Sequence, residues 1–253
     1  MDLIYLVTIG YRCSFVIGLL SLFIAKLYLP VFLQYGKTIT KNNKGESNDS
    51  NVNKVLFKIE HFTVPKSYFS HFYIISTILS IAVLKDYPKY PISWLLLVHS
   101  LRRLYETIYV SKYSKNSRMN WSHYIVGIWF YSVLHLIVRI KLHQGKISKD
   151  INIVSLVIFI IASWDQYKNH RVLSELVKYS LPTKRLFKIC CSPHYFDEIL
   201  IYSSFVSYNN EFIWLLIWVI ASLSISAIET KAYYKDKFRH QFVPNHAIIP
   251  FIL

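Results

Sequence analysis

Charged side chains interrupt an apolar part of the sequence at His99-Ser-Leu-Arg-Arg-Leu-Tyr-Glu106. On a helix, the i, i+4 and i, i+3 spacings place His99, Arg103 and Glu106 on one face, and Arg102 also reaches Glu106. Charges beside apolar segments are costly and therefore indicate a compensating partner or a function. One interpretation is an ion pair within the helix end, in which the charged side chains neutralise one another. The other is a polar site where arginine binds phosphate or carboxamide groups of a ligand.

A second polar cluster, Trp-Asp-Gln-Tyr-Lys-Asn-His at positions 164–170, directly follows a later apolar block. Gln166 and His170 are spaced i, i+4, so a helix places both side chains on one face. Lys178 lies about two helical turns further along the chain. The cluster is equally typical of a helix that simply leaves a membrane, and both interpretations stay open.

A third cluster begins at Tyr179 and ends with Ser-Pro-His-Tyr-Phe-Asp-Glu at positions 192–198. Its two carboxylates open an apolar block, and acidic residues at that place are also typical of a helix N-terminus. The alternative is that His194, Tyr195 and Glu198 converge on one ligand, which would make this segment part of a binding site.

The sequence lacks the fingerprints of common soluble enzymes. It contains no GxGxxG, P-loop, HExxH or GxSxG motif, and six glycines are too few for a glycine-rich phosphate loop. The three cysteines form no CxxC pair, and the scattered histidines have no metal-ligand spacing. We therefore expect no metal and no flavin. A dinucleotide would have to be bound by side chains inside a helical bundle.

Long apolar blocks must position these clusters. Of the 253 residues, 53% are hydrophobic and 17% are charged, and the apolar residues come in blocks suited to crossing a hydrocarbon core, which takes about 20 helical residues. We predict an all-α, multi-pass transmembrane helical bundle that forms a single domain over residues 1–253. The first block lacks a signal cleavage site and is expected to be a retained span. The predicted spans, about seven, are Leu3–Leu33, Tyr68–Leu84, Ile92–Val110, Trp121–Val138, Ile151–Trp164, Phe196–Ser207 and Phe212–Ile228.

The positive charges orient this bundle. With the N-terminus lumenal and the C-terminus cytosolic, nineteen Lys and Arg residues fall in cytosolic segments and six in lumenal ones. This bias follows the positive-inside rule. Residues 36–54 are polar and rich in Asn, Ser and Lys, which predicts a flexible cytosolic loop. The net charge of +15 has the same origin, so it does not indicate a nucleic-acid partner.

Four segments, in order along the chain, resemble the steroid 5α-reductase family. They are Val64-Pro-Lys-Ser-Tyr-Phe-Ser-His-Phe-Tyr73, the segment His99–Tyr109, Ser192-Pro-His-Tyr-Phe-Asp-Glu-Ile-Leu-Ile-Tyr202, and Ala232–Phe238 with the C-terminal Ile248-Ile-Pro-Phe-Ile-Leu253. The first two are most similar to the branch of polyprenol (polyprenal) reductases of dolichol synthesis. The similarity covers residues from about 60 to 253, and the order of the segments makes it specific.

The resemblance implies a seven-helix reductase of the endoplasmic reticulum membrane that uses NADPH, with its active site toward the cytosol. Glu106 and Tyr195 match important residues of the related enoyl-reductase branch, and His99 is a further catalytic candidate. Lys231 replaces a histidine that is common in the family, and as a point charge it would still suit a phosphate. The cofactor site carried over from the family comprises Arg103, Gln166, His170, Tyr179, His194, Glu198, Tyr234 and, with this replacement, Lys231.

The sequence departs from the steroid-reducing members at the residues that hold the substrate carbonyl. Those enzymes use a Gln-Glu-Leu-Pro segment and a His-Tyr pair, whereas this chain has Phe62-Thr-Val-Pro65 and His99-Ser100. The absence of the carboxylate–tyrosine pair favours polyprenal over a steroid as the substrate. A polyprenyl chain is itself soluble in the lipid bilayer, which explains an enzyme buried there, and no obligate protein partner is evident.

The expected chemistry needs a conjugated carbonyl. Hydride adds to the β-carbon of an α,β-unsaturated aldehyde because charge then develops on the oxygen, and an isolated allylic alcohol offers no such acceptor. The protein must place a donor at the oxygen and deliver a proton to the α-carbon. Tyr195, Tyr234 and His99 are the candidates, and Tyr195 is ranked first.

Other functions remain as alternatives. The same fold and chemistry serve trans-2-enoyl-CoA reductases and 3-oxo-steroid 5α-reductases, although the former are expected to carry an additional N-terminal soluble domain. A methyltransferase of the isoprenylcysteine type would have a similar C-terminal bundle and would use S-adenosylmethionine. A non-enzymatic multi-pass membrane protein such as a transporter should show inverted repeats or interrupted helices, and neither is visible.

Overall fold

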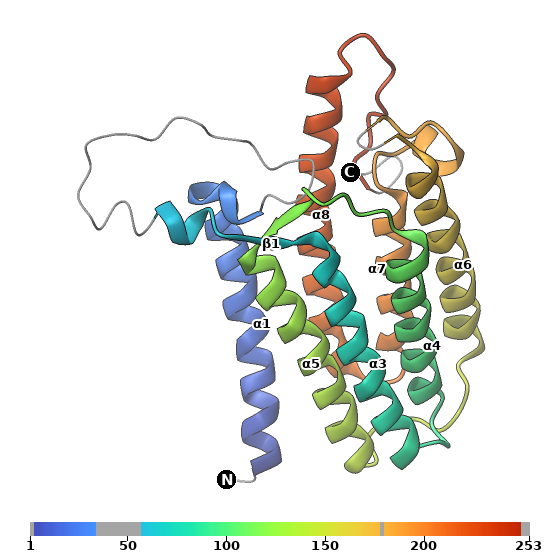
Figure 1. Cartoon of the computed structure of the whole chain (residues 1–253). Helices are drawn as coiled ribbons and strands as arrows, with labels where there is room; N and C mark the ends of the chain where they lie inside the picture. The colour runs from blue at the N-terminus through green and yellow to red at the C-terminus, as the bar shows by residue number, and fades with distance from the viewer. Residues whose placement is uncertain (1–2, 34–56, 178–179, 249–253) are drawn as a thin grey trace.

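The computed structural model, which describes residues 3–33, 57–177 and 180–248, is a bundle of long helices lying side by side (Figure 1). In Figure 1, α1 begins at the bottom of the bundle and α8 ends at the top. The predicted loop over residues 36–54 lies outside the described residues. The long helices are α1 (Leu3–Tyr28), α3 (Phe69–Asp86), α4 (Pro91–Tyr105), α5 (Trp121–His143), α6 (Ile153–Glu175), α7 (Pro193–Val206) and α8 (Ile213–Lys237).

Four helical segments are long and apolar enough to cross a membrane. They are Leu3–Tyr28, Lys66–Asp86, Trp121–His143 and Asn210–Lys237. The prediction of a helical membrane protein is confirmed at this level. The remaining long helices differ from the predicted spans in length and polarity: α4 has 15 residues, α7 has 14, and α6 continues past the predicted end at Trp164 to Glu175. The polar cluster at 164–170 therefore belongs to a helix.

A short antiparallel pair of strands is added to the helical fold. Strand β1 (Thr63–Pro65) pairs with β2 (Arg118–Asn120), with Thr63 opposite Asn120. The Arg118 guanidinium also donates to the Thr63 carbonyl oxygen at 2.5 Å. The pair lies where α3 and α5 begin, so it joins the N-terminal ends of these two helices (Figure 1).

Two ion pairs attach helix α1 to the rest of the bundle. Arg12 pairs with Glu211, with its Nε donating to the carboxylate at 3.0 Å, and Lys26 pairs with Glu229 of α8. Much of the rest of α1 is exposed apolar surface, as expected of a helix that faces lipid. The partner Glu211 explains how an apolar block accommodates Arg12.

Helices α3 and α5 approach closely at Gly127. A Cβ atom at this position would lie 2.6 Å from the ring of Phe72, which is itself buried. Small residues at helix crossings in membranes let the backbones come together, because close van der Waals packing replaces the hydrophobic driving force of water. The absence of a side chain at Gly127 therefore sets the distance between α3 and α5.

A chain of hydrogen bonds joins α3, α4 and α5 inside the bundle. Ser76 and Ser100 lie 2.7 Å apart at their hydroxyls, Ser80 and Ser100 3.1 Å, and Ser80 lies 2.8 Å from His135 Nε2. His135 Nδ1 is 2.8 Å from the Tyr131 carbonyl oxygen, which only accepts. The ring proton therefore lies on Nδ1, so Nε2 accepts from Ser80, Ser80 accepts from Ser100, and Ser100 accepts from Ser76.

The Gly127 packing is tested by substitution. We expect Gly127→Ala to lower the free energy of unfolding by about 1–3 kcal/mol, because the added methyl group overlaps the Phe72 ring. Thermal unfolding of the detergent-solubilised protein measures the effect. Gly10→Ala is the matched control, since nothing lies within 4 Å of its added Cβ atom. Equal melting temperatures for the two variants would contradict this account.

The serine–histidine chain is tested at its centre. Ser80→Ala removes the donor to His135 Nε2 and leaves that nitrogen unpaired in the apolar interior, which should destabilise the protein by about 1–3 kcal/mol. Ser70→Ala on the same helix is the control, because the Ser70 hydroxyl is exposed and donates only locally, to Ser67. The comparison again uses thermal unfolding, and a loss in Ser70→Ala as large as in Ser80→Ala would count against the network.

Candidate active site

The centre of the candidate site is the buried carboxylate of Glu106. Arg102 Nη1 donates to one of its oxygens and Arg103 Nη1 to the other, each at 2.5 Å. Glu106 has no exposed surface and opens a π-helical turn, Glu106–Val110, whose wider hydrogen bond joins Ser111 N to the Glu106 carbonyl at 2.7 Å. Turns of this kind are rare and often occur at functional sites. Here the turn directly follows α4, whose last residues supply both arginines.

Helix α6 adds two polar side chains to this centre. His170 Nδ1 lies 2.7 Å from a Glu106 oxygen and 3.0 Å from Arg103 Nη1. Gln166 accepts from Arg102 Nη2 at 2.7 Å, and its amide nitrogen donates to the carboxylate of Glu198 on α7. The side chains at i and i+4 thus face the same site, and Gln166 links the arginines of α4 to the acid of α7.

Helix α3 completes the cluster through Tyr73. Arg103 Nη2 donates to the Tyr73 hydroxyl at 2.6 Å, and its guanidinium carbon lies 4.8 Å from the Tyr73 ring centroid. Both residues are thus joined by a hydrogen bond and by a cation–π contact. Side chains from four helices, α3, α4, α6 and α7, therefore meet in one polar cluster inside an otherwise apolar bundle.

His99 holds a hydrogen-bond donor that faces this cluster. Its Nδ1 lies 3.3 Å from Arg102 Nη2, and because a guanidinium only donates, Nδ1 accepts and the proton lies on Nε2. His99 is buried, and within the described part of the chain its Nε2 has no hydrogen-bond partner. The nearest carboxylate oxygen is Glu198 Oε1 at 3.7 Å. The geometry leaves an N–H group in the bundle interior available to a ligand.

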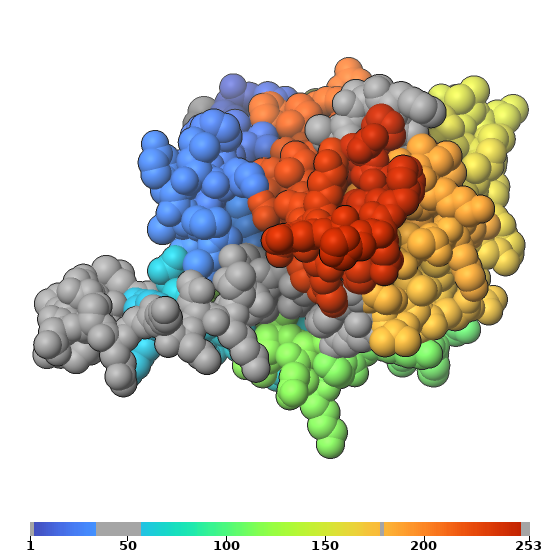
Figure 2. Space-filling model, turned by 90° about the horizontal axis from the view of Figure 1, so that it is seen from above, coloured from blue at the N-terminus to red at the C-terminus, as the bar shows by residue number. Residues whose placement is uncertain are grey.

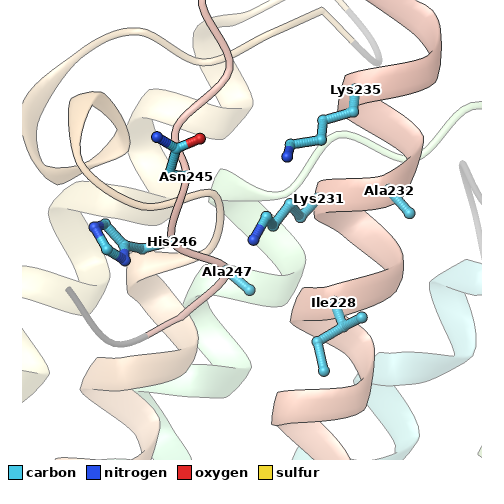
Figure 3. Close-up of a pocket in the computed structure, with 7 residues that line it drawn as sticks. All are labelled: Ile228, Lys231, Ala232, Lys235, Asn245, His246 and Ala247. Atoms are coloured by element: carbon cyan, nitrogen blue, oxygen red, sulfur yellow. The ribbon is translucent and has the colours of Figure 1, made fainter. Parts of the chain in front are cut away.

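A basic pocket lies at the end of α8 (Figure 3). Its volume is about 410 Å³, and it lies between α8 and the segment around Asn245 and His246. Lys231 and Lys235 extend from one side of α8 toward that segment, as Figure 3 shows. None of the lining residues is acidic, which suits an anionic group such as a phosphate.

The structure brings most of the predicted site residues together. Seven belong to the connected cluster around the buried carboxylate, and Tyr195 packs near it, with its ring centroid 4.3 Å from that of His194. Lys231 lines the separate basic pocket, whereas Tyr234 is buried against Leu181 and Cys191, and Tyr179 lies outside the described residues. The seven are His99, Arg103, Glu106, Gln166, His170, His194 and Glu198.

Some residues of the two sites had no assigned role in the sequence. Tyr73 stands within the segment Val64–Tyr73 but gave no sign that it would reach Arg103. Lys235 follows Lys231 at i+4, a spacing that indicates a shared helix face. His246 carries no local pattern, and only the fold brings it to the pocket. Within the described ranges, no three His, Cys, Asp or Glu side chains are grouped to hold a metal ion.

The role of Glu106 as the counter-ion of two arginines is directly testable. Glu106→Gln leaves both guanidiniums without their anion in a buried place and should lower the free energy of unfolding by about 3–5 kcal/mol. Glu175→Gln is the control, because Glu175 is half exposed and its ion pair among the described residues is with Arg171 at 3.4 Å. Thermal unfolding of both variants checks the prediction, and a Glu106→Gln protein as stable as the control would refute it.

Comparison with known proteins identifies the family. Residues 121–253, more than half of the chain, match the family described as 3-oxo-5-alpha-steroid 4-dehydrogenase. The chain is 57% identical to a polyprenal reductase of Saccharomyces cerevisiae over 244 residues, which cover 96% of this chain and 94% of that protein. It is also 29% identical to a polyprenal reductase of Drosophila melanogaster, over 93% of this chain and 88% of that protein. The identity to the polyprenal reductase of Homo sapiens is 29% as well, over 76% of this chain and 78% of that protein. The chain therefore belongs to the steroid 5α-reductase family, and this is confirmed independently by its family match and by its relatives.

Proposed function

We propose that this protein reduces the α-isoprene double bond of polyprenal with NADPH, on the route from polyprenol to the dolichol used in protein N-glycosylation. The names of its relatives and the family match support the reaction class. The observation in the structure that supports it most is the buried Nε2–H group of His99, which has no partner among the described residues. Such a donor is what a developing oxyanion in a membrane interior requires.

The residues around His99 supply the remaining parts of this reaction. Arg102 fixes the histidine tautomer by donating to Nδ1, so that Nε2 presents its proton to the aldehyde oxygen of the substrate. Buried aromatic rings of Tyr202 and Phe205 lie edge-on to the imidazole, at centroid distances of 5.8 and 6.4 Å, and exclude water from it. Tyr195 is the candidate that gives a proton to the α-carbon.

The residues present fit a phosphate-bearing dinucleotide. The basic pocket offers two lysines and no acid, and the buried Nε groups of Arg102 and Arg103 have no hydrogen-bond partner in the described ranges. NADPH supplies the hydride for the double bond when bound. The residues proposed to hold it are Arg103, Gln166, His170, Tyr179, His194, Glu198, Lys231 and Tyr234.

We further propose that the bundle spans the endoplasmic reticulum membrane seven times, with a lumenal N-terminus. Exposed apolar side chains recur at helical spacing on α6, at Ile153, Val157, Ile160 and Trp164, which suits a helix surrounded by lipid. Helix α4 exposes apolar residues in the same way, and α7 is enclosed by its neighbours. Because Lys and Arg collect at the end where α8 finishes, this end and its basic pocket face the cytosol and its NADPH.

The reaction is tested with purified membranes that contain the protein. Incubation with polyprenal and NADPH should saturate the α-isoprene unit, measured by mass spectrometry of the extracted lipid, whereas polyprenol, trans-2-enoyl-CoA and a 3-oxo-Δ4 steroid should not be reduced. Membranes with an empty vector are the control. Reduction of enoyl-CoA or the steroid, but not of polyprenal, would replace this proposal by the corresponding alternative.

Two substitutions separate the proposed donors. His99→Leu should lower kcat by about 100- to 1000-fold, the usual loss when one oxyanion donor is removed, and His99→Gln should recover part of it through its amide N–H. Tyr195→Phe should lower kcat with little change in KM. His143→Leu, at an exposed position of α5, is the control. Wild-type kcat in His99→Leu membranes, with protein amounts matched, would remove His99 from the mechanism.

A further inference from the structure

The C-terminal segment that lines one side of the basic pocket is held by a different part of the chain. Residues 180–192, here called the linking segment, are the described part of the α6–α7 connection that leads into α7, and their Cys191 amide donates to the His246 carbonyl at 2.9 Å. Leu181 and Cys191 of the linking segment are also buried against Tyr234 of α8. Seen from above in Figure 2, this part of the chain lies next to the end of α8 and the segment that follows it. The position of His246 in the pocket therefore depends on this linking segment.

Arg185 fixes the middle of the linking segment to α6. Its Nη2 donates to Asp165, and its Nε donates to the Asn169 amide oxygen at 3.4 Å. Arg185 has a φ of 55°, the left-handed region that residues other than glycine rarely adopt. An unfavourable backbone conformation persists only when surrounding contacts hold it in place. Here the contacts of the Arg185 side chain provide that hold.

The residues that receive Arg185 form a second, distinct polar network. The Asn169 amide nitrogen donates to Asp165 at 3.0 Å and to Asp197 of α7 at 2.8 Å. Asn169 is completely buried and Asp197 almost so. The Asn169–Asp197 bond lies beside the bond between Gln166 and Glu198, which are their neighbours on the same two helices. Arg185 is therefore attached, through Asn169, to a buried network that joins α6 and α7.

We propose that Arg185 is a positioning residue of the cofactor site, which pins the linking segment to α6 and so holds His246 at the basic pocket. The identity of the ligand, NADPH, rests on the proposed function. The attachment of the linking segment to α6 rests only on the contacts described above. Arg185 itself does not line the pocket. Without its side chain the linking segment can leave α6, and the fraction of molecules with a formed pocket falls. The apparent affinity for NADPH falls by the same fraction.

Limited digestion with a lysine-specific protease tests the attachment without any enzyme assay. Lys184 and Lys188 flank Arg185, are exposed, and stay unchanged in the variants. We expect Arg185→Ala, in the full chain in membranes, to be cleaved at these lysines roughly ten-fold faster than wild type. Arg171→Ala is the matched control. Arg171 lies on α6, and both it and its ion-pair partner Glu175 are half exposed, so its removal should not free the linking segment. Equal cleavage of Arg185→Ala and wild type would overturn the proposal.

Two further variants separate the side chain from the backbone. Arg185→Gly removes the contacts and also relieves the backbone strain, so we expect it to be cleaved faster than wild type but no faster than Arg185→Ala. Arg185→Gln adds no lysine and keeps an amide donor that can reach Asp165, but it loses the charge and the bond to Asn169, so an intermediate rate is expected. If Arg185→Gly resists the protease as wild type does, the backbone shape and not the side chain holds the segment, and the proposal is wrong.

The link to the cofactor is tested by kinetics and by protection. Arg185→Ala should raise the KM for NADPH roughly ten-fold and leave the KM for polyprenal and kcat unchanged, and saturating NADPH should slow its cleavage toward the wild-type rate. Faster cleavage with an unchanged KM for NADPH would overturn the role in the cofactor site. If faster cleavage is seen in membranes that do not reduce polyprenal at all, the attachment by Arg185 stands and the proposed reaction falls.

Discussion

A carboxylate with no access to solvent has to be neutralised where it is, and Glu106 imposes this requirement on the whole bundle. The guanidinium groups of Arg102 and Arg103, at the end of α4, neutralise the carboxylate. In turn, neither arginine could be buried without that anion. Each arginine then has donors left over. Arg103 uses one on Tyr73 of α3, and Arg102 uses one on Gln166 of α6. The satisfaction of one buried charge thereby determines how four helices are placed relative to one another.

The interior contains a second kind of polar chemistry that carries no charge. The chain of three serines and His135 joins α3, α4 and α5 through neutral hydrogen bonds, each of which has a fixed direction. Neutral groups are far less costly to bury than ions, so this network can lie among apolar side chains without counter-ions. The charged cluster lies toward α6 and α7, on the side where the site is proposed. The buried charges of this cluster thus lie in the part of the bundle where a ligand can use them.

The sequence allowed the helices and part of the candidate site to be predicted, for reasons that differ. Apolar blocks located the long helices, and the i, i+3 and i, i+4 spacings grouped His99, Arg103 and Glu106, because both are local properties of a helix. Local spacing cannot show that Arg103 meets Tyr73, since that contact needs the packing of α3 against α4. Helix α6 continues past Trp164, the end of the fifth predicted span, to Glu175. There the polar residues that usually follow a membrane helix continue the helix into the interior of the bundle.

The two ion pairs of α1 carry a consequence for how the protein is made. Arg12 and Lys26 leave the ribosome near the start of synthesis, and their partners Glu211 and Glu229 follow about two hundred residues later. Both ion pairs therefore form only after Glu211 and Glu229 have been synthesised, and until then Arg12 and Lys26 have neither of these partners. Water or lipid headgroups have to solvate the two cations in the interval, because a charge without a partner is costly in the hydrocarbon.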